Sequence, residues 1–83
     1  MENFINLGNA TGKRVKELLF QNKMSVYRLA QITCLRERTL SNLINGRTAD
    51  VKMSTVYLIS SAFNMDILEF LSPDYFRNNN IEI

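Results

Sequence analysis

The sequence contains no histidine and only one cysteine among its 83 residues, and these absences exclude most kinds of site chemistry. One cysteine cannot form an internal disulfide, and without histidine no Cys/His set can hold a zinc ion. No acid–base or nucleophilic residue set remains either, because the carboxylates do not cluster. The sequence therefore predicts a protein that is not an enzyme and has no metal, cofactor or small-molecule ligand.

Long apolar segments are also missing. The uninterrupted apolar runs span only a few residues, so we expect neither a membrane span nor a signal peptide. A chain of this length with a 46% hydrophobic share is sized for one folded domain. We expect a cytoplasmic protein, in a reducing compartment where the thiol stays free.

Basic residues are concentrated in the first part of the chain. Between residues 13 and 52, nine basic residues stand against three acidic ones, a net charge of +6. Between residues 53 and 83, one basic residue stands against four acidic ones, a net charge of −3. This asymmetry favours a polyanionic partner for the basic part. A set of solvated helix faces is the alternative, and charge alone does not separate the two.

Residues 25–46 have the pattern of two short helices joined by a tight turn at residues 33–35. The expected inward side chains are Leu29, Ala30 and Ile32 in the first helix and Leu40, Leu43 and Ile44 in the second. The second helix also carries polar side chains expected in solvent: Glu37, Arg38, Ser41, Asn42 and Asn45. This is the layout of a helix-turn-helix whose second helix reads the major groove of DNA.

Capping side chains predict where the other helices begin. Thr11 is the expected cap of a first helix over residues 12–22, and Ser25 caps the next helix. The first helix should bury Val15, Leu18 and Leu19 and expose Lys13, Arg14, Lys16 and Glu17. Ser54 is the expected cap of a helix that ends near residue 63, and Asp66 forms a capping box for residues 67–71.

Two positions are expected to have a left-handed backbone. Gly46 suits the end of the second helix of the 25–46 unit, which should start near residue 36 or 37. Cys34 lies at the corner, where glycine is usual, and a side chain there costs on the order of 1 kcal/mol. A redox role for Cys34 is conceivable, but a buried, inert thiol is the simpler interpretation.

The segments LAQITCLRERTLSNLING and STVYLISSAFNMDILEFL together resemble the Cro/C1-type helix-turn-helix family, also called the XRE family. The chain is most similar to the small single-domain members found in Gram-positive bacteria and their mobile elements. The resemblance covers residues 13–71. It implies an all-α, five-helix, lambda-repressor-like helix-turn-helix domain with a short C-terminal extension. We accordingly expect an N-terminal arm at 1–10, the domain at 11–71 and a tail at 72–83.

The resemblance also implies which residues would contact DNA. The expected base-reading residues are Glu37, Arg38, Ser41 and Asn42. The expected phosphate-binding residues are Ser25, Tyr27, Arg28, Arg36, Thr39, Asn45, Arg47 and Thr48, the last three in a loop over residues 45–52 that is expected to contact phosphates. Chemically, Arg38 can bind guanine O6 and N7, and Glu37 can accept a hydrogen bond from cytosine N4. The alternative for these two residues is a surface ion pair.

Two functions remain open at this point. The first is a sequence-specific regulator of transcription, a repressor, that binds double-stranded DNA as a homodimer. The second is a protein-interaction or antitoxin-like module that keeps the fold. For the dimer, the expected surface is the apolar tail, with Phe70, Leu71, Tyr75, Phe76, Ile81 and Ile83. The alternative is that these side chains fold back over the first helix and complete the core.

Overall fold

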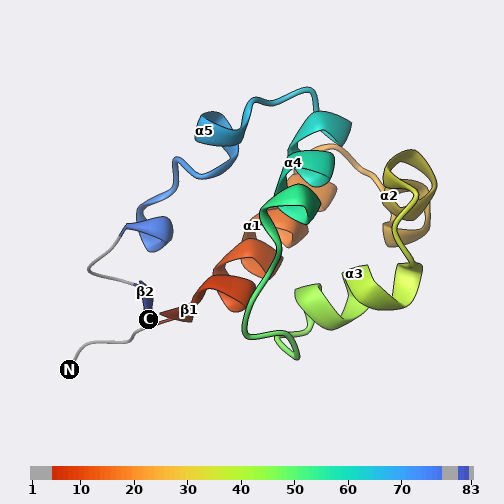
Figure 1. Cartoon of the computed structure of the whole chain (residues 1–83). Coiled ribbons are helices and arrows are strands. Elements are labelled where there is room, and N and C mark those ends of the chain that lie inside the picture. The colour runs from red at the N-terminus through yellow and green to blue at the C-terminus, as the bar shows by residue number, and fades with distance from the viewer. Residues whose placement is uncertain (1–4, 78–80, 83) are drawn as a thin grey trace.

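Helix α1 (Leu7–Gln21) lies at the centre of the computed structural model, which describes residues 5–77 and 81–82. Helices α2 (Val26–Thr33), α3 (Glu37–Ile44), α4 (Met53–Ala62) and α5 (Ile67–Phe70) are arranged around it (Figure 1). A 3-10 turn, η1 (Asp74–Phe76), follows α5, and two short strands, β1 (Ile5–Asn6) and β2 (Ile81–Glu82), pair in parallel. The prediction of an all-α, five-helix fold is confirmed.

Helix α1 begins earlier than predicted. Asn6 is its N-cap, and the Asn6 side chain accepts a hydrogen bond from the Asn9 backbone N–H at 2.7 Å. Thr11 is not the cap; it is fully buried inside the helix, and its hydroxyl donates to the Leu7 carbonyl at 2.8 Å. The start at residue 12 was wrong because asparagine caps a helix at least as well as threonine. Residues 7–10 of the expected arm therefore form the first turn of α1, while residues 1–4 lie outside the described residues.

The core receives side chains from all five helices. Its buried members are Val15, Leu18, Leu19, Leu29, Leu40, Leu43, Val56, Ile59 and Phe70. One expected inward residue is wrong, because Ile32 is 43% exposed and Thr33 is buried instead. Leu29 and Thr33 are four residues apart, so they lie on one face of α2, and Ile32 lies at the edge of that face.

Gly12 allows α1 to approach the end of α3. A Cβ at this position would overlap the Leu43 carbonyl group and lie 2.8 Å from its carbon atom. Because the obstacle is backbone rather than a flexible side chain, a larger residue would require the two helices to move apart. Gly12 is buried in this contact, so α1 packs directly against the end of α3.

Arg14 joins α1 to α5. Its guanidinium donates hydrogen bonds to the carbonyl oxygens of Phe70, at 2.9 Å, and Glu69, at 3.2 Å. These carbonyls are at the end of α5, where a cation compensates for missing intrahelical partners. The expectation that Arg14 is solvated was wrong, since its side chain is only 12% exposed.

The tail folds back onto α1. Phe70 is fully buried, Phe76 packs against the core at its edge, and the Tyr75 hydroxyl donates to Glu17 at 2.6 Å. The Lys13 ammonium lies 4.5 Å from the centre of the Tyr75 ring. Of the two alternatives for the tail, the structure therefore has the folded-back one for residues 70–76. Ile81 pairs with Ile5 through the backbone, and Ile83 lies outside the described residues.

Candidate nucleic-acid interface

The corner between α2 and α3 is fixed by hydrogen bonds of Thr33 and by a left-handed residue. The Thr33 hydroxyl donates to the Leu29 carbonyl at 2.8 Å and accepts from the Leu35 backbone N–H at 3.2 Å. Cys34 has φ 62° and ψ 18°, as expected for the left-handed corner position. Its side chain is exposed rather than buried. The corner therefore sets the angle at which α3 leaves α2.

Helix α3 is held on one side and open on the other. Leu40 is fully buried and Leu43 is 2% exposed, so these two side chains anchor the helix in the core. On the opposite side Glu37 and Arg38 are exposed, whereas Ser41 and Asn42 are half-buried. Among the described residues, neither Glu37 nor Arg38 forms an ion pair, so the alternative of a surface pair does not apply to this structure. Their charged groups are free to bind a ligand.

The start of α2 lies beside α3. Ser25 is the N-cap, as predicted, and its hydroxyl accepts from the Arg28 backbone N–H at 3.0 Å. Tyr27 is 59% exposed, and its hydroxyl accepts a hydrogen bond from Gln31 at 3.1 Å. Arg28 is exposed without a side-chain partner in the described part of the chain. A helix N-terminus beside an exposed arginine is suited to bind a phosphate group.

Residues 45–52 continue this surface beyond α3. Gly46 has φ 74° and ends α3 as predicted, and the Arg47 backbone N–H donates to the Asn42 carbonyl at 2.9 Å. Asn45 and Arg47 are exposed and Thr48 is half-buried. Arg36 and Thr39, at the start of α3, are exposed as well. The structure thus places every predicted DNA-contacting residue on α2, α3 or this loop.

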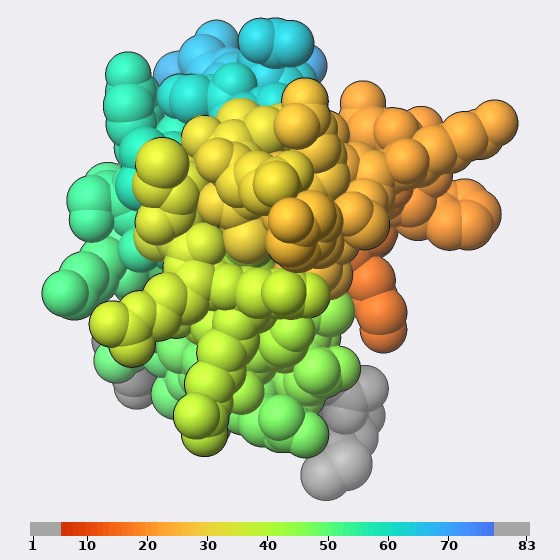
Figure 2. All heavy atoms as spheres, turned by 90° about the vertical axis from the view of Figure 1, so that its right-hand side faces the viewer, coloured from red at the N-terminus to blue at the C-terminus, as the bar shows by residue number. Residues whose placement is uncertain are grey.

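Figure 2 shows α2 and α3 together on one face, with the loop after α3 below them. Residues 25–52 carry five basic and two acidic side chains, so this part of the chain is positively charged. A positively charged face that presents α3 suits the major groove of duplex DNA, which accepts one α-helix.

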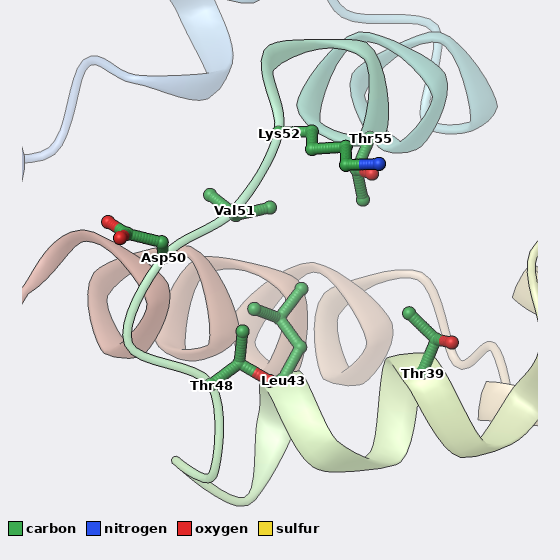
Figure 3. Close-up of a pocket in the computed structure, with 7 residues that line it drawn as sticks. All are labelled: Thr39, Leu43, Thr48, Asp50, Val51, Lys52 and Thr55. Atoms are coloured by element: carbon green, nitrogen blue, oxygen red, sulfur yellow. The ribbon is translucent and has the colours of Figure 1, made fainter.

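A groove between α3 and α4 adds Thr55, which sequence reasoning missed, to the predicted surface. It has a volume of about 270 Å³ and is lined by Thr39, Leu43, Thr48, Asp50, Val51, Lys52 and Thr55. In Figure 3 the Lys52 and Thr55 side chains lie above it and Thr39 lies below. Lys52, not Ser54, is the N-cap of α4, and no side chain caps this end. Lys52 lies at the end of the loop where phosphate contacts were expected, whereas Thr55 is on α4 and was not singled out from the sequence.

In the described part of the chain, the side chains of histidine, cysteine, aspartate and glutamate form no group of three that could hold a metal ion. Within the same residues, no helix has the length and apolar character needed to cross a membrane.

Comparison with known proteins agrees with this geometry. Residues 14–74 match the sequence profile of the Cro/C1-type HTH DNA-binding domain. Because the match spans most of the chain, the protein belongs to this family of DNA-binding domains. The chain is also similar to the crystal structure of the prophage Lp1 protein 11, with a TM-score of 0.77 and 16% sequence identity. That similarity covers 90% of this chain and 99% of the prophage chain and concerns the fold. No curated protein matches the chain.

Proposed function

We propose that this protein is a sequence-specific transcriptional regulator that inserts α3 into the major groove of double-stranded DNA. The observation that carries the proposal is that one face of α3 is buried in the core and the opposite face is exposed. Leu40 and Leu43 hold it in the core, while Arg38 and Glu37 project into solvent without ionic partners among the described residues. A helix that is anchored on one side and presents charged and polar side chains on the other is the arrangement that major-groove reading requires.

In this proposal the roles divide between bases and phosphates. Arg38 and Glu37 read base edges at the start of α3, and Ser41 and Asn42 read bases one turn further along. Phosphates of one strand are bound at the start of α2 by Ser25, Tyr27 and Arg28. Phosphates of the other strand are bound by the loop after α3. The phosphate contacts at and after α3 are assigned to Arg36, Thr39, Asn45, Arg47 and Thr48, with Lys52 and Thr55 added from the groove.

Repression and dimerisation are further parts of the proposal. A domain bound across a promoter blocks polymerase without any enzymatic step. One short helix contacts only a few base pairs, so recognition of a genomic site calls for two half-sites about 34 Å apart and a dimer to bind them. Tyr75 and Phe76 are engaged with α1 and the core in the folded domain, so a dimer would have to use other apolar residues. Phe20, at 85% exposure, and Leu68, at 79%, are the most exposed candidates.

The alternative of a protein-interaction or antitoxin-like module loses its main support. It rested on an acidic, apolar tail available to a partner, and on the unusual Glu37 at the start of α3. Phe70 is fully buried and Tyr75 is bonded to Glu17, so this part of the tail is occupied within the domain. The basic face with α3 is the better supported binding surface.

The proposal is tested by selecting bound duplexes from a random pool with the full chain, and then titrating the enriched duplex at increasing salt. We expect one enriched motif and a binding constant that falls steeply with salt, because several phosphate contacts release counterions. Absence of any enriched sequence, or of binding at low salt, would contradict the proposal.

A further inference from the structure

The loop that carries Arg47 is supported from behind by the first turn of α1. The Gly8 backbone N–H donates a hydrogen bond to the Ala49 carbonyl at 2.8 Å. Beside Gly8, Asn9 places its side-chain oxygen 3.4 Å from the position that a Cβ on Gly46 would take. The loop therefore contacts two consecutive residues at the start of α1: Gly46 lies near Asn9, and Ala49 is bonded to Gly8.

Gly8 contacts the backbone of the loop so closely that there is no room for a side chain at this position. A Cβ on Gly8 would overlap the Thr48 carbonyl oxygen and lie 2.7 Å from the carbonyl carbons of both Thr48 and Ala49. Real Cβ atoms do not approach backbone so closely, so any side chain at position 8 must push the loop outward. The residue is buried, although it lies in the segment that sequence reasoning assigned to an arm.

We propose that Gly8 is a positioning residue for DNA binding: its missing side chain and its backbone N–H fix the loop so that Arg47 and Thr48 can reach the phosphates. The inference rests on the proposed function, because it explains what holds Arg47 and Thr48 in position for the phosphate contacts that this function requires. Arg47 itself is exposed, and its side chain has no partner among the described residues. The direction in which Arg47 projects therefore depends on two backbone contacts: its own N–H bond to the Asn42 carbonyl, at 2.9 Å, and the contact of Gly8 with the backbone of Thr48 and Ala49. A displacement of the loop would remove phosphate contacts while leaving the base-reading side of α3 anchored by Leu40 and Leu43.

The test compares Gly8→Ala with the wild-type chain and with Ile59→Val, a control that weakens the core away from the loop. For Gly8→Ala we expect binding to every duplex to weaken about tenfold, and the slope of log affinity against log salt to decrease by about 1. The ratio of affinities for the selected duplex and a single-base variant should stay at the wild-type value. Ile59→Val should leave both the slope and the ratio unchanged, because a loss of stability removes no phosphate contact from the folded protein.

Hydrogen exchange of the Gly8 amide gives a second measurement that needs no variant. Its exchange should slow further when the wild-type chain binds DNA, because the phosphate contacts immobilise the loop that accepts its hydrogen bond. If Gly8→Ala fails to fold, this measurement decides, and unchanged exchange in the complex would overturn the inference. A folded Gly8→Ala that keeps the wild-type salt slope would also overturn it. A wild-type chain that binds no duplex would instead refute the proposed function, and the inference with it.

Discussion

The hydroxyl of Tyr75 donates a hydrogen bond of 2.6 Å to Glu17, joining two residues that are 58 positions apart in the chain. Lys13 contacts the same ring from one turn earlier in α1, 4.5 Å from its centre. The tail is therefore part of the folded domain in the region of residues 74–76. This contact makes the stability of the domain dependent on pH in a way that the sequence did not suggest.

Stability should fall at alkaline pH because of Tyr75. Partial burial, and then the hydrogen bond to the Glu17 carboxylate, raise the pKa of Tyr75 above its ordinary value of 10.0. The unfolded chain loses this proton at about pH 10, whereas the folded chain holds it to higher pH. The stabilisation of the folded state by protonated Tyr75 is thus complete below pH 10, and it is lost progressively as the pH rises above that value.

The measurement is urea unfolding of the wild-type chain and Tyr75→Phe between pH 7 and pH 11. At pH 7 the variant should be less stable by about 1 kcal/mol, the usual net value of one partly exposed hydrogen bond. The difference should shrink as the pH rises above 10. A difference that stays constant over the whole range would show that the hydroxyl does not bond to Glu17.

Truncation after Ser72 tests whether the tail belongs to the core. The cut removes Tyr75 and Phe76, which cover α1 and Phe70. We expect the shortened chain to melt well below the full chain, because the Phe70 ring would become exposed to water. Circular dichroism measures the melting temperature. A truncated domain that keeps the full melting temperature but sediments as a monomer, where the full chain is a dimer, would show the tail to be a dimer surface.

Replacing Cys34 by glycine should stabilise the protein. Its φ of 62° is unfavourable for a residue with a side chain, and glycine removes that cost of about 1 kcal/mol. Glycine also makes the unfolded chain more flexible, which cancels part of the gain, so the net increase should be about 0.5 kcal/mol. Cys34→Ala is the matched control, since it removes the thiol but keeps the Cβ, and it should bring no increase. Equal stability of the two variants in urea unfolding would mean that the corner is not strained.

The features predicted correctly from the sequence depend on local interactions. Ser25 and Asp66 were predicted as caps from residue type and position, and in the structure each accepts a hydrogen bond from the backbone N–H three residues ahead, at 3.0 and 2.9 Å. The left-handed positions at Cys34 and Gly46 follow from the tight turns between periodic segments. Local sequence patterns also predicted all five helices, and the resemblance to the family predicted how they are arranged.

The wrong predictions concern residues whose surroundings are formed by parts of the chain far away in the sequence. Arg14 was expected in solvent because its partners, the carbonyls of Glu69 and Phe70, are more than fifty positions away. The start of α1 was misplaced because Asn6 and Thr11 are both acceptable caps, and the sequence does not show that Gly8, in the first turn, contacts Ala49. The assignment of base and phosphate contacts stays a prediction.

The central claim is that α3 reads DNA bases, and the most direct test is selection from a random duplex pool with Arg38→Ala, with Arg47→Ala as the matched control. Both variants lose one exposed arginine. Arg38→Ala should cost roughly 1–3 kcal/mol on the wild-type duplex and relax the preference at one base pair of the enriched motif. Arg47→Ala should weaken binding to all duplexes about equally and leave the motif intact. An unchanged motif with Arg38→Ala would contradict the account, because α3 would then not be the helix that reads the bases.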